Sequence, residues 1–340
     1  MGAVEPGRRP TMRDVARAAG VSQSLVSIVF RGVPGAGEQT RRRVLEAADR
    51  LGYVRDESAR SLRAREATTL GVCFQARGPF HHELLDGLYV ATADTTHHLV
   101  LSATSDDRGE SEAIQDLLSY RCGALILLGS LLGDDELADL ARTVPVVTVA
   151  RRSEASEVDW VASDDAQGMQ ELLGHLKGLG HTDIAFLSCP EAAGGVDRLR
   201  AFEAAAGSQG LEACVRVLPG GMTEQAGAAV AEDLLAAGDL PTAVVGFNDR
   251  AALGVIDVFI RRGVRIPADV SVVGFDDSEI ASRDPIRMTS VHQDPAGLAR
   301  FAAERAIQRL SAAGPATQAR GTLLPTSLVV RTTTGPARGR

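Results

Sequence analysis

The sequence predicts two structural units: an N-terminal all-α helix-turn-helix headpiece and a larger α/β region of parallel sheets with helices on both faces. Three observations predict them. Amphipathic segments joined at a glycine occupy residues 11–31, basic residues are concentrated in the first 63 positions, and apolar runs alternate with amphipathic segments from about residue 69 onward. Such alternation is typical of βαβ units, whose strands are parallel.

Length and composition indicate a globular chain of two or three domains. The chain has 340 residues, of which 44% are hydrophobic and 24% charged, and this composition excludes a disordered protein. No apolar run approaches the roughly 20 residues of a membrane span, and the opening MGAVEPGRRP lacks the apolar stretch of a secretory signal. The four cysteines form no CxxC pair, so we expect reduced thiols and a cytoplasmic protein.

Charge is distributed unevenly along the chain. Residues 1–63 contain 12 Arg against 7 Asp and Glu, a net charge of +5, whereas the whole chain carries −8 and the remainder therefore −13. A basic N-terminal part on an acidic body indicates that only the N-terminal part meets a polyanion.

A capping box predicts where the first helix begins. Thr11 can accept a backbone N–H of the first turn, and Asp14 three residues later can reach back to the helix start. Gly20 suits the left-handed end of this helix, and Ser22 can cap a second helix that runs to about Phe30. An apolar stripe follows the first helix at Met12, Val15, Ala16 and Ala19.

Two short helices joined at a tight glycine turn match a helix-turn-helix, whose second helix enters the major groove of DNA. A third helix is expected over residues 38–51, with apolar side chains on one face at Val44, Leu45, Ala48 and Leu51. Its outer face carries three arginines that can meet phosphates, Arg41, Arg42 and Arg43. A plain three-helix bundle with a solvated arginine face is the alternative at this point.

The N-terminal motif resembles the headpiece of the LacI/GalR (lactose-repressor/galactose-repressor) family of bacterial transcription regulators. Residues 11–27 read Thr-Met-Arg-Asp-Val-Ala-Arg-Ala-Ala-Gly-Val-Ser-Gln-Ser-Leu-Val-Ser, and Leu-Gly-Tyr at 51–53 and Ala-Arg-Ser-Leu-Arg at 59–63 resemble that family's third-helix end and hinge. The resemblance implies a DNA-binding domain at residues 11–53 and a hinge helix with linker at 54–68. Residues 1–10 precede the motif, and we expect them to be disordered.

The resemblance also implies which residues contact DNA. Three side chains match base-reading positions of the second helix: Gln23, Ser24 and Ile28. Five more match positions near the phosphates: Thr11, Ser22, Leu25, Ser27 and Arg31. Ala59 and Leu62 match the hinge helix, in which a leucine from each subunit wedges into a minor-groove step and bends the DNA.

Three positions depart from the family pattern. Ile28 stands where the family commonly has arginine, which can bind guanine bidentately and discriminate by about 1–3 kcal/mol. Because Ile28 can instead touch a thymine methyl, we expect an operator unlike the family average. Arg55 and Asp56 replace the Pro-Asn before the hinge, so the rigid proline is gone and a cap remains. Gly37 replaces the usual serine cap of the third helix, at a cost of a few tenths of a kcal/mol.

The region after residue 68 shows strand-like apolar runs separated by helical patterns. The runs lie at residues 70–74, 99–101, 124–128, 144–149, 184–187, 243–247 and 270–275. In sheets of this kind, ligands bind outside the carboxyl ends of the strands.

Polar pairs follow three apolar stretches, at Asp164-Asp165, Asn248-Asp249 and Asp276-Asp277. Each residue taken alone is better explained as a helix cap, and we assign Asp165, Asp249 and Asp277 to that role. Three strand ends that carry a carboxylate or an amide together favour one ring of groups that binds a polyol.

Four motifs of this region resemble the core of the same family, which is similar to a periplasmic sugar-binding protein. They are Arg-x-x-Ala-Phe at 198–202, Asn-Asp-Arg-Ala-Ala-Leu-Gly at 248–254, the segment from Gly-Val-Arg-Ile-Pro at 263–267 to Gly-Phe-Asp-Asp at 274–277, and Arg-Thr-Thr-Thr at 331–334. They imply a two-lobed core of the periplasmic-binding-protein type I kind over residues 69–334. Three lobe crossings are expected near residues 160, 290 and 324, and a tail at 335–340.

The same motifs imply an effector site made by Asp164, Arg198, Asn248 and Asp276. These groups suit the hydroxyls of a sugar, and Phe80 or Phe247 would cover the apolar face of its ring; for Phe80 a core position is an equal alternative. Closing of the lobes on a ligand would misalign the hinge helices of a dimer, so that the effector controls operator binding allosterically. No leucine heptad follows Arg331, which favours a homodimer on a palindromic operator.

The expected function is therefore a transcription regulator, with repression favoured, that has no cofactor, no metal and no enzymatic activity. Against an enzyme, the chain lacks Gly-x-Ser-x-Gly, P-loop and Ser-x-x-Lys motifs, and the histidine pairs at 81–82 and 97–98 lack HExxH spacing. A stand-alone solute-binding protein would carry a signal peptide and no basic headpiece. A family member that responds to a nucleobase-type corepressor, or to no effector, is the remaining alternative.

Overall fold

The computed structural model describes residues 8, 10–53, 68–311 and 319–339. The chain divides into two compact units, Met1–Arg65 and Glu66–Arg340, which we call the head and the body.

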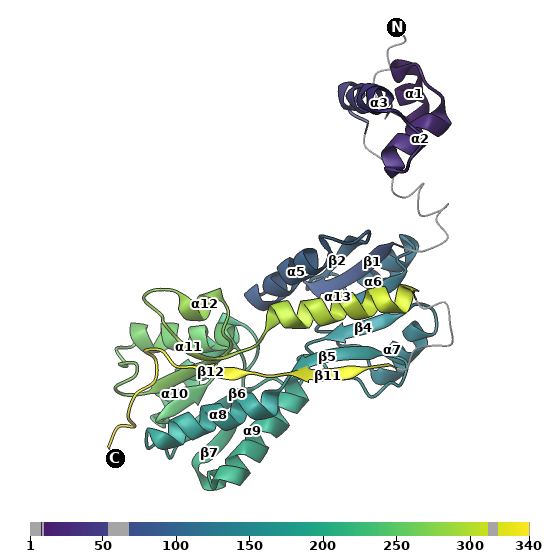
Figure 1. The fold of residues 1–340 in the computed structure, drawn as a ribbon. Helices are drawn as coiled ribbons and strands as arrows, with labels where there is room; N and C mark the ends of the chain where they lie inside the picture. The colour runs from purple at the N-terminus through teal and green to yellow at the C-terminus, as the bar shows by residue number, and fades with distance from the viewer. Residues whose placement is uncertain (1–7, 9, 54–67, 312–318, 340) are drawn as a thin grey trace. The chain divides into compact units, whose positions relative to one another are not determined.

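The head consists of three helices, α1 (Met12–Ala19), α2 (Gln23–Arg31) and α3 (Glu38–Leu51) (Figure 1). The predicted capping box is present, because Thr11 donates to Asp14 from its backbone N–H at 2.9 Å and from its hydroxyl at 2.7 Å. Helix α1 ends at Gly20 with a φ of 65°. Ser22 then accepts the backbone N–H of Leu25 at 3.2 Å and begins α2. These local bonds define the turn between the two helices.

A small apolar core holds the three helices of the head together, and Val15, Val26, Val44 and Ala47 are fully buried in it. The prediction for Leu45 is wrong, because this side chain is 48% exposed. Successive residues of a helix are rotated by about 100°, so Val44, Ala47 and Ala48 occupy the inner face and Leu45 falls outside it.

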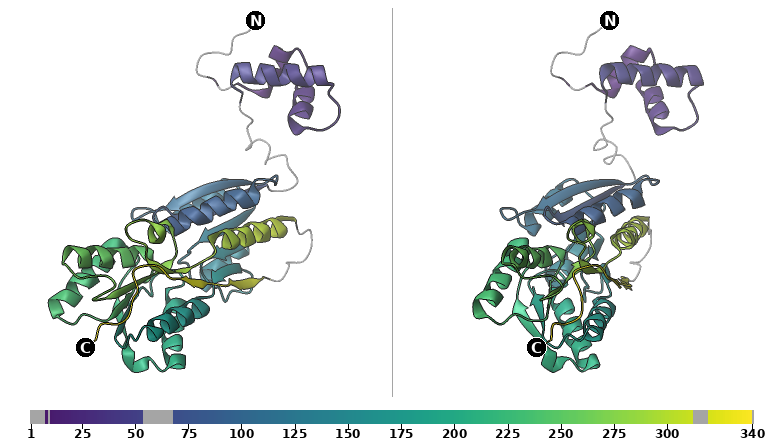
Figure 2. Two further views of the ribbon diagram at one scale, coloured as in Figure 1. Left: turned by 60° about the vertical axis from the view of Figure 1, so that its left-hand side comes forward. Right: turned by 90° about the vertical axis from the view of Figure 1, so that its left-hand side faces the viewer.

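The body contains two six-stranded sheets in separate lobes (Figures 1 and 2). In the first, which we call lobe N, the strand order is β11-β5-β4-β3-β1-β2 and all neighbours are parallel. Its strands are β1 (Thr69–Gln75), β2 (His98–Thr104), β3 (Ala124–Leu128), β4 (Val146–Val149), β5 (Asp159–Ser163) and β11 (Gly321–Leu324). Its helices are α5 (Pro79–Thr92), α6 (Glu110–Ser119), α7 (Asp134–Ala141) and α13 (Pro295–Ser311).

The second sheet forms lobe C, with the order β12-β10-β9-β8-β6-β7. Its strands are β6 (Ile184–Ser188), β7 (Val215–Pro219), β8 (Ala243–Val245), β9 (Ser271–Asp276), β10 (Thr289–His292) and β12 (Ser327–Val329). Its helices are α8 (Asp165–Gly178), α9 (Gly195–Gln209), η1 (Glu212–Cys214), α10 (Glu224–Ala237), α11 (Asp249–Arg261) and α12 (Glu279–Ser282). The edge strand β12 is antiparallel to β10, and the other neighbours are parallel as predicted.

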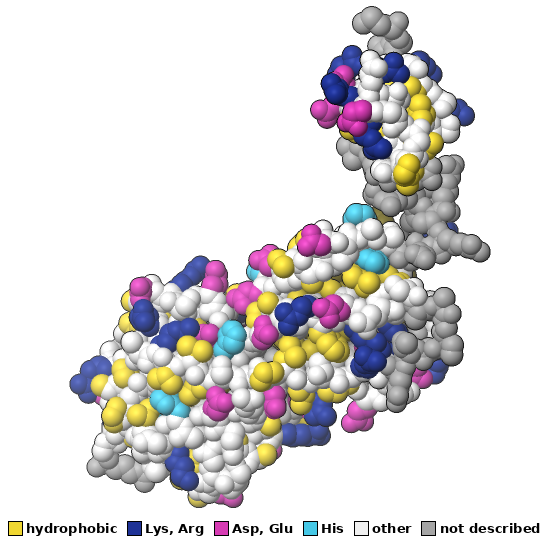
Figure 3. Space-filling model, in the orientation of Figure 1, with side chains coloured by type: hydrophobic (Ala, Val, Ile, Leu, Met, Phe, Trp, Pro, Cys, Tyr) yellow, Lys and Arg dark blue, Asp and Glu magenta, His cyan; other side chains and the backbone are white. Residues whose placement is uncertain are grey.

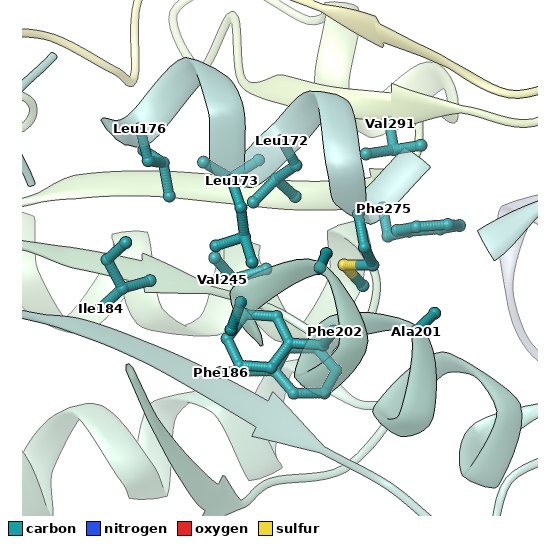
Figure 4. Close-up of a cluster of buried hydrophobic side chains, with 14 of the residues drawn as sticks. Leu172, Leu173, Leu176, Ile184, Phe186, Ala201, Phe202, Val245, Phe275 and Val291 are labelled. Atoms are coloured by element: carbon teal, nitrogen blue, oxygen red, sulfur yellow. The ribbon is translucent and has the colours of Figure 1, made fainter. Parts of the chain in front are cut away.

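Helices cover both faces of each sheet, as the alternating pattern predicts. In lobe N, buried residues of α5 and α13 pack on one face, and those of α6 and α7 on the other. In lobe C, α8 and α9 cover one face, and α10 and α11 the other. Figure 4 shows the first of these lobe C clusters, in which Phe186 of the sheet stacks on Phe202 of α9 with ring centroids 4.6 Å apart.

The chain passes between the two sheets three times. The first crossing leads from β5 through Asp164 into α8, the second from β10 through residues 293–294 into α13, and the third from β11 through residues 325–326 into β12. Because three segments distant in sequence meet between the lobes, this is where groups from both lobes can be brought together.

Close helix packing explains one residue of the core motifs. A Cβ atom at Gly254 of α11 would lie 1.9 Å from the carbonyl oxygen of Glu224 in α10, so only glycine allows the two helices to approach this closely.

The C-terminal segment after residue 331 lies against lobe C. The carbonyl of Thr333 accepts the N–H of Val272 at 2.9 Å, and Ala337 donates to the carbonyl of Leu179 at 2.9 Å. Arg338 donates to the carbonyl of Asp269 at 2.6 Å. Residues 335–338, expected as a tail, are thus hydrogen-bonded to the lobe.

Among the described residues, none of the helices combines the length and the apolar character needed to cross a lipid bilayer. Figure 3 shows acidic and basic side chains interspersed on the face of the body that it presents. The thiols of Cys73, Cys122 and Cys189 are free and buried, and Cys214 is free and half-buried.

Candidate functional site

Helix α2 presents a polar face of small side chains beside a buried apolar one. Val26 and Val29 are buried, whereas Ser22, Gln23 and Ser24 are exposed. The remaining residues assigned to DNA contact include exposed Thr11 and the half-buried Leu25, Ser27 and Ile28. Arg31 ends the helix, and its side chain lies outside the described part.

Two of these side chains have structural partners of their own. Ser22 caps α2 and also shares a hydrogen bond of 2.9 Å with the hydroxyl of Ser24. Ile28 lies beside Gly35 of the following loop, where an added Cβ would approach Ile28 Cγ2 to 3.4 Å. Ile28 is thus held by the head itself and exposes only part of its apolar surface.

Ion pairs and hydrogen bonds from other residues of the head hold α1 and α2 in place. Arg8 donates to both carboxylate oxygens of Asp14 at 2.9 and 3.0 Å. The hydrogen bonds from Thr11, together with Arg8, lower the pKa of Asp14 to about 2, so it is ionised at neutral pH. Arg41 donates to the carbonyl of Val29 at 3.2 Å near the end of α2. It therefore holds α2 in place, in addition to any contact with phosphate.

The predicted hinge residues Ala59 and Leu62, and the departures at Arg55 and Asp56, lie outside the described residues.

A cavity of about 330 Å³ lies between the lobes of the body. Residues of the first two crossings, of β11 and of α9 line it, among them Arg152, Ser163, Asp164, Asp165, Arg198 and Gln293. Of the six residues assigned to the effector, Asp164 and Arg198 thus line this cavity. Phe80, Phe247, Asn248 and Asp276 are not among its lining residues.

Arg198 is a buried cation in the lining of this cavity. It is buried, pairs with Asp165 at 3.3 Å, and donates to the carbonyl of Phe247 at 2.8 Å. Its guanidinium also lies over the rings of Phe275 at 3.7 Å and Phe247 at 4.8 Å. Phe247 therefore contacts Arg198 instead of lining the cavity. The hydrogen bond and the ring contacts restrict the orientation of the guanidinium.

Asp165 is the partner that the sequence interpretation missed. We assigned it to a helix cap, but Asp164 takes that position and accepts the N–H of Gln167 at 3.1 Å. Asp165 then points to Arg198. Burial raises the pKa of Asp165, and the Arg198 charge opposes this. In this pair the first residue caps the helix, and the second is free to point elsewhere.

Asn248 is a helix cap. Its side-chain oxygen accepts the N–H of Ala251 at 2.9 Å, and its amide donates to the carbonyl of Met222 at 3.2 Å. These bonds begin α11, where the apolar strand β8 ends.

The cap assignments of Asp249 and Asp277 are wrong as well. Asp249 is fully buried and accepts bonds from the N–H and hydroxyl of Ser278 at 2.7 and 2.8 Å and from the hydroxyl of Ser290 at 2.6 Å. Burial raises the pKa of Asp249 to about 7. Asp277 pairs with Arg331 at 2.6 Å and with His292 at 3.2 Å. Both carboxylates join strand ends of lobe C, which a local pattern does not reveal.

Phe80 belongs to the lobe N core, the alternative that the sequence left open. It is half-buried in α5 and packs against the cluster that contains Leu84 and Leu298, and its ring centroid lies 6.4 Å from that of His81.

Asp276 ends β9 in an unusual backbone conformation, with a φ of 114°. Its carboxylate is buried and accepts the side-chain amide of Gln293 at 2.7 Å. Burial, with Asp249 nearby, raises the pKa of Asp276 well above its usual value. Backbone conformations of this kind cost energy and concentrate at functional sites.

The described residues contain no cluster of three or more His, Cys, Asp or Glu side chains that is arranged to hold a metal ion.

Comparison with known proteins gives two family matches and close relatives. Residues 11–56 match the family described as bacterial regulatory proteins, lacI family, and residues 173–334 match a periplasmic binding protein-like domain. The HTH-type transcriptional regulator GalR of Salmonella typhimurium (strain SL1344) is 32% identical over 302 residues, which cover 87% of this chain and 88% of GalR.

Two solved structures share the fold over 96% of this chain and all of theirs. The lac repressor dimer bound to operator and the anti-inducer ONPF is 25% identical, with a TM-score of 0.83. The complex of the transcriptional regulator CelR with cellobiose is 30% identical, with a TM-score of 0.69. The similarity extends from the head through both lobes, and the chain belongs to the lacI family of bacterial regulatory proteins.

Proposed function

We propose that this protein is a cytoplasmic transcription repressor that binds a palindromic operator as a homodimer and is controlled by a sugar. The observation that carries the proposal is the pairing, in one chain, of an exposed polar helix α2 with a cavity lined by a buried arginine, carboxylates and an amide. The relatives support both halves, since the lac repressor dimer is bound to operator and CelR to cellobiose.

The cavity chemistry suits a polyhydroxylated ligand. A volume of about 330 Å³ is at the lower end of small-molecule sites, which span roughly 300–1,000 Å³. Asp164 and Asp165 supply acceptors, Arg198 supplies donors, and Gln293 supplies both. Arg198 uses part of its fork on Asp165 and Phe247, so its remaining N–H groups are oriented before a ligand arrives.

A thermal-melting panel tests the effector half. We expect one sugar among D-galactose, D-glucose, D-ribose and cellobiose to raise the melting temperature, because a ligand at 100 times its dissociation constant stabilises the folded state by about 2.7 kcal/mol. For a large domain each kcal/mol is worth roughly 2–4 °C. A shift with hypoxanthine or guanine instead would identify a nucleobase corepressor. No shift with any compound would contradict control by an effector, while leaving DNA binding to be judged by operator selection.

Ile28 gives a prediction for the DNA-binding half. We expect binding-site selection with the wild type to show no strong guanine requirement at the base pair that faces Ile28. The Ile28→Arg variant should acquire a guanine preference of about 5- to 150-fold, the equivalent of about 1–3 kcal/mol, because arginine can bind guanine bidentately.

The matched control is Val33→Arg, which adds the same charge at a position that is 40% exposed and lies beyond α2. It should strengthen binding to all sequences alike without changing the base preference. Selection of a strict guanine by the wild-type protein would show that Ile28 does not occupy the base-reading position.

A further inference from the structure

The lining of the cavity between the lobes is rich in arginine. The ionisable side chains that the structure describes in this lining are arginines and aspartates, namely Arg151, Arg152, Arg198, Arg200, Asp164, Asp165 and Asp197. Arg151 and Arg152 follow β4 of lobe N, whereas Arg198 and Arg200 belong to α9 of lobe C. Arginine side chains of both lobes therefore line the same space.

The aspartates of the lining already have roles within the protein. Asp165 pairs with Arg198 at 3.3 Å, and Asp197 lies 3.9 Å from Arg200. Asp164 caps α8. Two of the arginines are thus paired with carboxylates of the lining itself, and the charges of Arg151 and Arg152 remain to be explained.

Arg151 and Arg152 differ in what they contact. Arg151 pairs with Asp134 at 3.4 Å and donates to the carbonyl of Ser130 at 3.2 Å, so its charge is used at the start of α7. The guanidinium of Arg152 lies over the ring of Trp160, 5.4 Å from its centroid. Within the described ranges of the chain, Arg152 has no carboxylate at ion-pair distance. It is the cation of this lining whose charge the described residues leave uncompensated.

The ring beneath Arg152 is held by the sheet of lobe N. Trp160 lies in β5, and a Cβ atom at Gly321 of the neighbouring strand β11 would lie 1.9 Å from the indole Cε2. The backbone of β11 therefore packs directly against the indole. A guanidinium that stacks on an aromatic face keeps its N–H groups available for a carboxylate or a phosphate, which it can bind with two hydrogen bonds.

The two lobes approach each other closely beside Arg152. A Cβ atom at Gly194, where α9 begins, would lie 3.1 Å from the carbonyl oxygen of Ala150. Gly194 and Ala150 both line the cavity, whose volume is about 330 Å³. One small ligand can therefore contact Arg152 of lobe N and the side chains of α9 at the same time.

We propose that the effector is an anionic sugar, whose phosphate or carboxylate group binds Arg152 while its hydroxyl groups bind Asp164 and Arg198. This rests on the proposed function, in which the cavity binds a sugar. A neutral sugar leaves the charge of Arg152 without a partner, so the anionic group adds a charge-assisted hydrogen bond that the neutral parent compound lacks.

The test compares matched pairs of compounds that differ in the anionic group. The pairs are D-glucose with D-glucose 6-phosphate, D-ribose with D-ribose 5-phosphate, and D-galactose with D-galacturonate. Trp160 is the single tryptophan of the chain, and its contact with Arg152 makes its fluorescence a local signal for a titration of the full-length protein. Melting shifts give the dissociation constant where the emission does not change.

We expect the anionic member of at least one pair to bind about 10- to 100-fold more tightly than its neutral parent, the gain of a hydrogen bond to a charged group. Added KCl should reduce this preference, because salt screens the charges. A preference confined to the phosphate pairs identifies a sugar phosphate as the effector class, and one confined to galacturonate identifies a sugar acid.

Substitutions of Arg152 test whether this side chain is the source of the preference. Arg152→Gln removes the charge, and the ratio of the two dissociation constants should fall toward 1. Arg152→Lys keeps the charge without the planar fork and should give an intermediate ratio. Arg142→Gln is the matched control, because Arg142 is a 70% exposed arginine of lobe N that does not line the cavity. It should keep the wild-type ratio.

Equal binding of both members of every pair overturns the proposal, and so does a preference that persists in Arg152→Gln. A preference lost equally in Arg142→Gln also overturns it, since the overall charge of the lobe would then be the cause. In each of these cases a sugar still binds, and the proposed function stands. Binding of none of the compounds would contradict both the anionic effector and control by a sugar.

Discussion

Replacing Arg198 by alanine is expected to lower the free energy of unfolding of the body by about 3–5 kcal/mol, because it leaves a buried charge without its partner. Asp165 loses the guanidinium 3.3 Å away, and its side chain is only 14% exposed. The variant also loses the hydrogen bond to Phe247 and the contacts with two aromatic rings. We further expect the variant to lose the sugar-induced rise in melting temperature, since Arg198 lines the cavity.

Chemical denaturation of the single and double variants tests whether Arg198 and Asp165 stabilise the body as a pair. The double variant Arg198→Ala/Asp165→Ala should be more stable than the sum of the two single effects predicts, by about 0.5–3 kcal/mol. Arg200→Ala is the control, because Arg200 lies two residues away and is 75% exposed, with Asp197 at 3.9 Å. It should change stability by less than about 0.5 kcal/mol. Additive single effects would show that Arg198 and Asp165 do not act as a pair.

Asp159→Ala should destabilise the body by a similar amount, about 3–5 kcal/mol. The Asp159 carboxylate is fully buried at the start of β5 and accepts Nε of Arg305 at 2.6 Å and the backbone N–H of Arg320 at 2.8 Å. Arg309 lies 3.6 Å from its second oxygen. Arg305 and Arg309 belong to α13, and Arg320 immediately precedes β11. One carboxylate therefore ties together segments adjoining all three crossings.

The effect of Asp159→Ala is measured by chemical denaturation and by hydrogen exchange of α13, which should become faster. The control is Asp139→Ala, also in lobe N, whose pair with Arg142 is about 70% exposed on both sides. This variant should stay within about 0.5 kcal/mol of the wild type. If the two aspartates had equal effects, the buried network would not be what holds the lobe N ends of the crossings.

The elements that the sequence predicted well are those stabilised by neighbours in the chain. The turn between α1 and α2 depends on Thr11, Asp14, Gly20 and Ser22, which act on backbone groups at most a few residues away. The buried strands β3 and β9 are continuous apolar runs, and both were predicted nearly at their observed bounds. By contrast, β10, β11 and β12 span three or four residues each and carry polar side chains. No apolar run indicated these strands, although they adjoin two of the three crossings.

The roles of the residues in the polar pairs could not be predicted from their neighbours in the chain. Each pair was recognised as lying at a strand end, but the role of each member depends on which distant group faces it. Asp165 faces Arg198, Asp249 faces Ser278 and Ser290, and Asp277 faces Arg331. Gln293 carried no signal at all, because a single glutamine between a short strand and a helix is unremarkable until Ser163 and Asp276 are seen on either side of it.

The sequence by itself determined the helix-turn-helix, the alternation of strands and helices, and the family to which the chain is similar. Capping, periodicity and burial patterns depend on residues that are close to one another in the chain. Only the tertiary structure decided which side chains line the cavity and which hold one another in place. Those roles arise from contacts between residues up to about 160 positions apart, as for Asp159 and Arg320, and such contacts exist only once both sheets have formed and the three crossings have brought their ends together.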